Sequence, residues 1–231
     1  MLHVILDHPS HPGNIGSVAR AMKTTGFDQL ILCQPREFPS ELADQRSTHG
    51  LSIVKSAKVI QDLDAYLDTV DYVFACSKRP RGLQIDHFNP KIAAALVNAA
   101  LKKEQQVAVL FGNETSGLSN ETIEKAHGVI EIPMADFNDS LNLSHAVQVI
   151  LYEIMMAPID QMSCPQNEMP KADEKNCFED HFKQVLEQKG LIRHGSTWSK
   201  IRCMLRRLRP DRRELQLLFG LLTADNPVEK K

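Results

Sequence analysis

Short apolar runs alternate with segments whose apolar residues recur every three or four positions along the first 157 residues. The apolar runs, which predict β-strands, lie at 2–6, 29–33, 71–75, 107–111 and 129–132. Strands that alternate with helical segments are typical of a mostly parallel sheet covered by helices. The sequence therefore predicts an α/β fold for residues 1–157. Its last element is a helix at 142–157, with Leu143, Val147, Ile150 and Ile154 on one stripe.

The pattern changes after residue 157. Residues 158–176 are polar, contain three prolines and show no apolar period, which predicts a linker. Helical spacing returns in residues 177–231, which we predict to form a small all-helical extension. Its two apolar stripes are Phe178, Phe182, Val185 and Leu186, and Leu215, Leu218, Phe219 and Leu222.

The overall composition is that of a globular protein. Of the 231 residues, 42% are hydrophobic and 24% are charged, which excludes the disordered and fibrous classes. No apolar run is long enough to span a membrane, and the N-terminus lacks the pattern of a signal peptide. The five cysteines form no CxxC pair, which argues against a disulfide framework or a zinc site. We therefore expect a cytoplasmic protein with no membrane association and no metal.

Positive charge is concentrated near the C-terminus. Residues 181–213 contain ten Lys and Arg residues against two acidic ones, a local net charge of +8. The rest of the chain, with 17 basic and 27 acidic residues, carries −10, so the total of −2 hides the asymmetry. Such a block either binds a polyanion such as RNA or forms a solvated helix surface.

The loop after the first predicted strand runs into "GNIGSVARAM" at 13–22. The apolar spacing predicts a helix that begins near Asn14, a residue type that suits an N-cap. Glycines ahead of a helix can expose N–H groups to an anion, and Arg20 lies off the buried stripe. The stretch is either a phosphate site or a tight turn with a capped helix. It contains neither a GxGxxG fingerprint nor a Walker loop.

Two more strands end in polar loops that lead into helices. "VAVLFGNETSGLSNE" carries Gly112, Glu114 and Gly117, with Ser119 or Asn120 as the helix cap. "IEIPMADFNDSLNLSHAVQV" carries Ser140 and Asn142, either of which can cap the helix at 142–157. Because the carboxyl ends of parallel strands share one edge of a sheet, the three loops together predict a ligand site there.

"PGNIGSVARAM", "LFGNETSGLSNE" and "IPMADFNDSLNLSHAVQV" resemble, in order and spacing, the three motifs of the TrmH-like RNA 2′-O-ribose methyltransferases of the SPOUT superfamily. The C-terminal stretch "GLIRHGSTWSKIRCMLRRLRPDRRELQLLFGLL" is similar to the tail of the TrmJ-like tRNA methyltransferases, which act on cytidine or uridine 32 of the anticodon loop. The resemblance implies a C-terminal trefoil knot in the α/β domain and S-adenosylmethionine bound in that knot. It also implies tRNA as the substrate and a homodimer with its active sites at the interface.

The resemblance also assigns site residues. Five match the motifs' catalytic positions: Asn14, Arg20, Glu114, Ser140 and Asn142. Seven match the cofactor-binding loops: Ser77, Gly112, Glu114, Gly117, Ile132, Ser140 and Leu141. Arg79 and Arg81 are either additional phosphate contacts or a plain surface pair, and we interpret His8 and His11 as polar loop residues.

Arg20 is a poor proton acceptor, because a guanidinium stays protonated. We expect it to hold a phosphate and to stabilise negative charge that develops on the 2′-oxygen, while a phosphate or water takes the proton. Two alternatives stay open: an rRNA 2′-O-methyltransferase and a non-catalytic RNA-binding protein with this fold. The intact set of polar motif residues favours an enzyme over the second.

Overall fold

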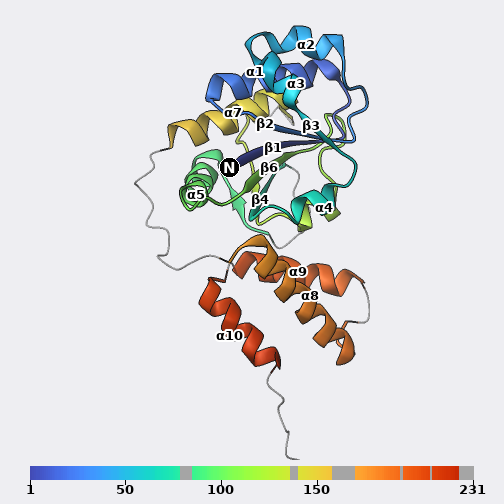
Figure 1. Ribbon diagram of the computed structural model, residues 1–231, viewed down its shortest axis with the longest axis vertical. Helices are drawn as coiled ribbons and strands as arrows, with labels where there is room; N and C mark the ends of the chain where they lie inside the picture. Colours follow the sequence, from blue (N-terminus) through green and yellow to red (C-terminus); the bar gives the residue numbers. More distant parts are fainter. Residues whose placement is uncertain (79–84, 136–139, 158–169, 193–194, 209, 224–231) are drawn as a thin grey trace, which may run out of the picture.

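A seven-stranded parallel sheet forms the centre of the computed structural model, which describes residues 1–78, 85–135, 140–157, 170–192, 195–208 and 210–223 (Figure 1). The strand order is β3-β2-β1-β6-β4-β7-β5, and all neighbouring pairs are parallel. The strands are β1 (Leu2–Asp7), β2 (Gln29–Cys33), β3 (Lys58–Ile60), β4 (Tyr72–Cys76), β5 (His87–Phe88), β6 (Val107–Phe111) and β7 (Gly128–Ile130). This order confirms the predicted mostly parallel α/β fold.

Helices cover both faces of the sheet. One face packs against α1 (Pro12–Thr25), α2 (Glu41–Ser47), α3 (Leu51–Ser56), α5 (Pro90–Lys102) and α7 (Leu143–Met156), with a 3₁₀ turn at Thr48–Gly50. The other face packs against α4 (Leu63–Leu67) and α6 (Asn120–Glu124). Alternate residues of β1 enter the two cores, Val4 and Leu6 on the first face and Ile5 on the second. Both faces of the sheet therefore pack against a hydrophobic core.

The order in which the chain adds strands to the sheet reverses between β1 and β6. From β1 the chain builds β2 and β3 on one side, and the later strands occupy the other side. Ligands in open α/β sheets bind at such a switch point, beyond the carboxyl ends of the strands. The loops after β1 and β6 meet there, and the segment from β7 to α7 runs along the same edge. That segment includes residues 136–139, which lie outside the described residues, so the trefoil knot stays a prediction.

Three helices lie at the other end of the molecule (Figure 1). They are α8 (Ala172–Gln188), α9 (Gly195–Leu208) and α10 (Arg212–Thr223). Their small core contains Phe178, Leu205 and Leu215, packed against side chains of the two predicted stripes such as Phe182 and Phe219. None of the described helices combines the length and the apolar composition that crossing a membrane requires.

The start of α8 corrects the predicted linker, because residues 172–176 are helical. Two contacts start the helix at Ala172. The Lys171 N–H donates to Glu174 Oε2 at 3.0 Å, and the Ala172 N–H donates to Asp71 Oδ1 at 2.8 Å. Asp71 lies just before β4, so this anchor on the sheet is a tertiary contact that local composition does not reveal.

Candidate active site

Helix α1 begins earlier than the sequence predicted. His11 is the N-cap, and its Nδ1 accepts a hydrogen bond from the Gly13 N–H at 3.1 Å. Pro12 occupies the first helical position, where a missing N–H has no cost. The predicted N-cap at Asn14 is therefore wrong, and Asn14 lies inside the first turn with its side chain available for other contacts.

The glycines of this motif serve packing rather than an open anion loop. A Cβ on Gly16 would lie 2.2 Å from the carbonyl oxygen of Ala43, so only glycine allows α1 to approach α2 this closely. Gly13 is buried, and its N–H is used by His11. The interpretation of these glycines as a phosphate cradle is therefore not supported by their place in the helix.

Glu114, in the loop after β6, accepts four hydrogen bonds from the loop after β1 and the first turn of α1. Its Oε2 accepts from the Ser10 N–H at 2.9 Å and the Ser10 hydroxyl at 2.7 Å. Its Oε1 accepts from Asn14 Nδ2 at 2.8 Å and from the His11 N–H at 3.3 Å. One half-buried carboxylate thus ties together two strand ends that are about a hundred residues apart in sequence.

These contacts fix the charge of Glu114. Burial alone would raise the pKa of its carboxyl group, but the hydrogen bonds from Asn14 and Ser10 outweigh burial and lower that pKa from 4.5 to about 2. The group is therefore a carboxylate at neutral pH. The carboxylate holds its donors in place, and a base this weak accepts protons poorly.

The third motif joins the same network through Asn142. Asn142 caps α7, and its Oδ1 accepts from the Ser144 N–H at 2.9 Å and the Ser144 hydroxyl at 2.7 Å. That arrangement orients its amide so that Nδ2 donates to Asn14 Oδ1 at 3.1 Å. The structure thus brings Asn14, Glu114 and Asn142, three of the five predicted catalytic residues, into one hydrogen-bonded chain.

A pocket of about 510 Å³ lies at the carboxyl ends of β4, β6 and β7. All seven predicted cofactor-binding residues line it: Ser77, Gly112, Glu114, Gly117, Ile132, Ser140 and Leu141. Its walls also include side chains that the sequence reasoning did not single out, such as Lys78, Phe111 and Met134. Apolar walls with a few polar groups suit a ligand that has both an aromatic ring and charged ends.

Gly112 keeps this pocket in shape. A Cβ at this position would lie 2.2 Å from the carbonyl carbon of Gly117 and 2.3 Å from the Leu118 nitrogen. Gly117 has a φ of 68°, which glycine adopts without strain. The two glycines therefore let the loop fold back on itself at the pocket rim.

Arg20 stands apart from this arrangement. It is exposed on α1, six residues and about 9 Å along the helix axis from Asn14. It is not one of the four donors to Glu114 described above, and it does not line the pocket. Arg79 and Arg81 lie outside the described residues.

Ser10 is the contact that sequence reasoning missed. Its position three residues after β1 marks it as a strand-end polar residue, but its pairing with Glu114 depends on how β1 and β6 lie side by side. His8 and His11 are polar loop residues as interpreted: His8 contacts Asp7, and His11 caps α1.

Ligand atoms of Asp7, His8 and Cys33 lie within 4.8 Å of one another, the spacing of a candidate metal cluster. Burial, together with the neighbouring Asp7 carboxylate, raises the pKa of the Cys33 thiol to about 12. The thiolate, which is the form that binds metals, is therefore disfavoured here.

Comparison with known proteins identifies the family. The SpoU rRNA Methylase family matches residues 1–152. The chain belongs to the SpoU methylase family. The solved methyltransferases described below superpose on this chain, which confirms the predicted SPOUT methyltransferase fold.

Relatives resemble this SpoU methylase along its whole length. The tRNA (cytidine/uridine-2′-O-)-methyltransferase TrmJ of Yersinia pestis is 35% identical over 243 residues, covering 100% of this chain and 94% of the relative. The crystal structure of TrmJ from Z. mobilis ZM4 superposes with a TM-score of 0.81 at 25% identity, covering 96% of this chain and 97% of that one. The likeness therefore includes α8–α10 as well as the sheet.

A more distant relative has been solved with a bound cofactor. The SpoU methyltransferase AviRb from Streptomyces viridochromogenes was solved in complex with the cofactor AdoMet. It is 26% identical with a TM-score of 0.52, and the match covers 67% of this chain and 59% of that one.

Proposed function

We propose that this protein transfers the methyl group of S-adenosylmethionine to the 2′-hydroxyl of cytidine or uridine 32 in tRNA. The observation that carries the proposal is the position of Glu114. Glu114 both lines the 510 Å³ pocket and holds the Asn14 amide, so the cofactor pocket and the polar chain are parts of one site. The full-length similarity to the TrmJ methyltransferase of Yersinia pestis supports tRNA as the substrate.

The residues of the pocket suit S-adenosylmethionine. Phe111, Ile132, Leu141 and Leu143 offer apolar contact to an adenine ring, and the loop at 112–117 offers backbone groups to the polar parts. When bound, the cofactor supplies a methyl group on a positively charged sulfur. The AdoMet complex of AviRb supports the same cofactor here.

The chain's own residues position the acceptor. Methyl transfer is an in-line displacement, so alignment of the attacking oxygen supplies much of the rate. Glu114 and Asn142 fix the Asn14 amide from two sides, which leaves Asn14 as a preset contact for the ribose. The proton of the 2′-hydroxyl passes to a phosphate or to water, because the carboxylate of Glu114 is already held by four donors.

Arg20 acts on the RNA backbone in this proposal. A guanidinium matches the geometry of a phosphate and remains charged, so it can stabilise negative charge that develops near the ribose. Its exposed position suits an RNA that is bound across the interface of two copies of the chain.

A second copy of the chain is proposed to cover α7. Val149, Tyr152, Met155 and Met156 are exposed on this helix, and the largest exposed fraction among them is 58% at Met156. Val149, Tyr152 and Met156 follow helical spacing, so they form one stripe. An exposed apolar stripe next to the site is typical of an interface, and we infer a homodimer.

The proposed organisation assigns residues 1–157 to catalysis and the helical unit that begins at Ala172 to RNA binding, in a cytoplasmic enzyme. Lys189, Lys200 and Arg213 are exposed on or next to α8, α9 and α10. They are available to the phosphates of a tRNA, which proteins recognise largely through backbone charge and shape.

The test is to incubate the purified protein with S-adenosylmethionine and unmodified tRNA transcripts, and to map methyl groups by nuclease digestion and mass spectrometry. A 2′-O-methyl pyrimidine at position 32 is the expected product. Methylation elsewhere in the tRNA would overturn the position, and methylation of rRNA alone would overturn the substrate. Absence of cofactor binding would favour a non-catalytic RNA-binding protein.

A further inference from the structure

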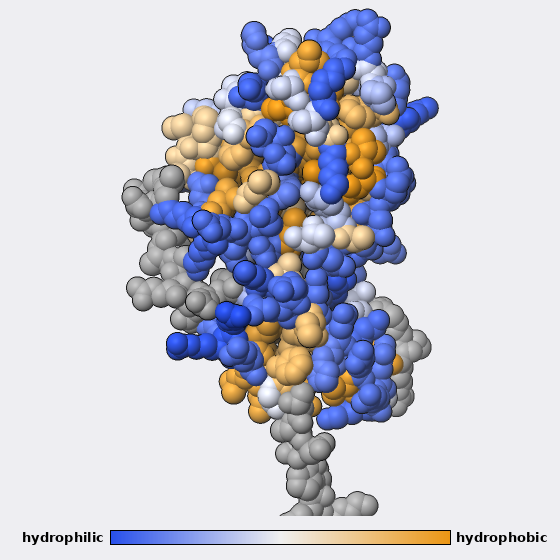
Figure 2. All heavy atoms as spheres, viewed as in Figure 1, coloured by the Kyte–Doolittle hydropathy of each residue, from blue (hydrophilic) through white to orange (hydrophobic). Residues whose placement is uncertain are grey.

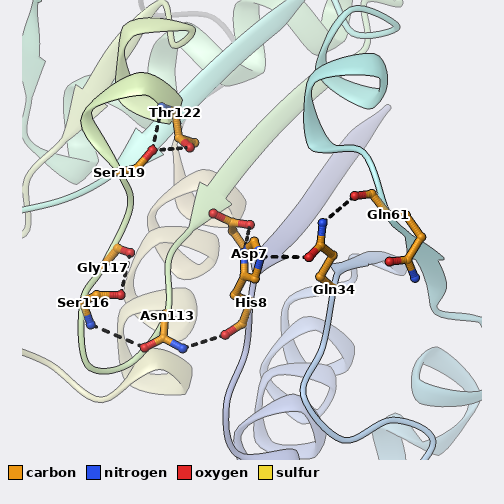
Figure 3. Close-up of polar contacts among 9 residues, drawn as sticks. All are labelled: Asp7, His8, Gln34, Gln61, Asn113, Ser116, Gly117, Ser119 and Thr122. Carbon is orange, nitrogen blue, oxygen red and sulfur yellow. Dashed lines mark hydrogen bonds and ion pairs between the residues drawn. The ribbon is translucent and has the colours of Figure 1, made fainter.

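A second pocket, of about 700 Å³, lies beside the cofactor pocket at the same edge of the sheet. Asn113 and Gly117 line both pockets, so the loop after β6 is the wall between them. Figure 3 shows Asp7, His8 and Gln34 between that loop and Gln61. Of the proposed catalytic and cofactor-binding residues, Gly117 alone lines this second pocket.

Two residues of this pocket have strained backbone. His8 has a φ of 51° and Gln34 a φ of 43°, both in the left-handed region that non-glycine residues rarely adopt. They follow the adjacent strands β1 and β2, and the N–H of His8 donates to the carbonyl of Cys33 at 2.9 Å. Strained residues of this kind concentrate at binding and catalytic sites, where the strain presents side chains that a relaxed turn would not.

The side chains of these residues form a continuous hydrogen-bonded row (Figure 3). His8 Nδ1 lies 2.6 Å from Asp7 Oδ1, and His8 Nε2 lies 3.2 Å from Gln34 Oε1. Gln34 Nε2 in turn donates to the Gln61 carbonyl oxygen at 2.6 Å, which fixes the orientation of its amide. Both edges of the His8 ring are thus held while 54% of its side chain stays exposed.

A fixed, exposed ring next to a fixed amide is a suitable surface for a nucleobase. Unpaired RNA bases stack on aromatic rings, histidine included, and are read by hydrogen bonds to their edges. The Gln34 amide has one further N–H and one further lone pair beyond the two contacts it makes. An adjacent donor and acceptor of this kind can pair with a base edge in two places at once.

The charge of the pocket argues against a phosphate as its ligand. The carboxylates of Asp7 and Glu121 line it, and Lys125 forms an ion pair with Asp64 within it. Acidic groups repel a phosphate but accept hydrogen bonds from the amino and imino groups of a base. The ligand chemistry that fits is therefore a neutral, planar heterocycle.

We propose that this pocket, built around His8 and Gln34, binds an unpaired base that neighbours the methylated nucleotide and thereby helps to select the target. The inference rests on the proposed function, because it takes the RNA to be the molecule whose ribose faces the cofactor pocket. The shared wall at Asn113 and Gly117 places the two pockets within reach of the same few nucleotides.

The test uses His8→Gly and Gln34→Gly in the full-length protein. Glycine adopts these positive φ values without strain, so the side chains are removed while the backbone is spared. Glu104→Gly is the matched control, because Glu104 also has a positive φ, of 58°, and lies in the turn that precedes β6, at the opposite end of that strand from both pockets. Methylation kcat/KM is measured on tRNA transcripts that carry each base in turn at the two nucleotides flanking the target, alongside S-adenosylmethionine affinity.

We expect the wild-type protein and the control to prefer one base at a flanking position. The two pocket variants should lose about 10- to 100-fold in kcat/KM on the preferred transcript and discriminate less between bases, with S-adenosylmethionine affinity unchanged. Wild-type discrimination in both variants would overturn the inference alone. An equal loss on all transcripts, or a loss of cofactor affinity, would also overturn it. A wild-type protein that methylates no tRNA would overturn the proposed function and this inference with it.

Discussion

Polar contacts hold both the carboxyl edge of the sheet and helices α8–α10 in place. At the sheet edge these contacts rest on a large hydrophobic core, whereas the core beneath α8–α10 is small. At the sheet edge, Glu114, Asn14 and Asn142 lie at the ends of well-packed elements such as β6, whose residues are all buried, and α7, which buries one face. The core of α8–α10 has only Phe178, Leu205 and Leu215 as buried apolar side chains among the residues described there. Its attachment to the α/β domain uses Asp71, Lys175 and the Arg202–Asp68 ion pair.

This difference suits the two proposed tasks. Alignment for methyl transfer requires side chains held to within a fraction of an ångström, which a packed sheet provides. Binding an RNA backbone requires charge on a surface, which a small helical unit can present without a deep core. Figure 2 shows the hydrophilic surface around the α8–α10 end, interrupted by apolar patches.

Removing the charge of Glu114 should have the largest effect. Glu114→Gln places an amide N–H₂ against the donors Ser10, His11 and Asn14, so the network that holds Asn14 breaks. We expect kcat/KM for tRNA methylation to fall about 10²- to 10³-fold. Glu104→Gln, at an exposed position away from the site, should leave it unchanged. A loss smaller than about tenfold in the Glu114 variant would show that the network does not position the substrate.

The same substitution in the two regions should have opposite effects on stability. Gly112→Ala forces a Cβ into the backbone of Gly117, and we expect the free energy of unfolding to fall by about 1–3 kcal/mol. Gly220→Ala, on an exposed position of α10 with open space around it, should raise helix stability by about 0.5–1 kcal/mol. Urea denaturation followed by circular dichroism measures the first. Hydrogen exchange in α10 measures the second, and a stabilised Gly112 variant would contradict the close approach.

The sequence predicted the long elements and the sheet edge at which the pocket lies, because each depends on local pattern. All five predicted strands are present. The sequence did not predict β3 and β5, because strands of three and two residues are too short to show an apolar pattern. The helix start at Pro12 was missed because histidine is an uncommon cap, although Pro12 itself is a standard signal for a first turn.

The partners of the site residues could not be predicted in the same way. That Ser10 rather than Arg20 contacts Glu114 depends on the register of β1 beside β6, in which Leu6 is paired with Phe111. The second pocket depends on two backbone conformations, at His8 and Gln34, that no residue-type preference suggests.

Neutralising exposed charge on the helical unit should affect RNA binding and leave the chemistry intact. A variant with Lys189, Lys200 and Arg213 changed to Gln should bind tRNA about tenfold more weakly near 0.1 M salt. Its slope of log K against log salt should be shallower by about two to three units if all three side chains contact phosphates. Arg202→Gln is the contrasting variant, because Arg202 Nε donates to Glu179 Oε2 at 2.8 Å inside the unit. An unchanged slope in the triple variant would place RNA binding elsewhere.

The smallest expected effect is the pH dependence that Glu114 gives to stability. Its pKa is lowered in the folded protein from 4.5 to about 2, so the carboxylate stabilises the fold fully above pH 4.5 and loses this contribution as the pH falls toward 2. Glu114→Gln has no such group. The difference in melting temperature between wild type and variant should therefore be constant from neutral pH to about pH 5 and shrink below it. If the difference stayed constant down to pH 2.5, the carboxylate would not be held by the hydrogen bonds of Ser10 and Asn14, and the rigidity ascribed to the sheet edge would need another source.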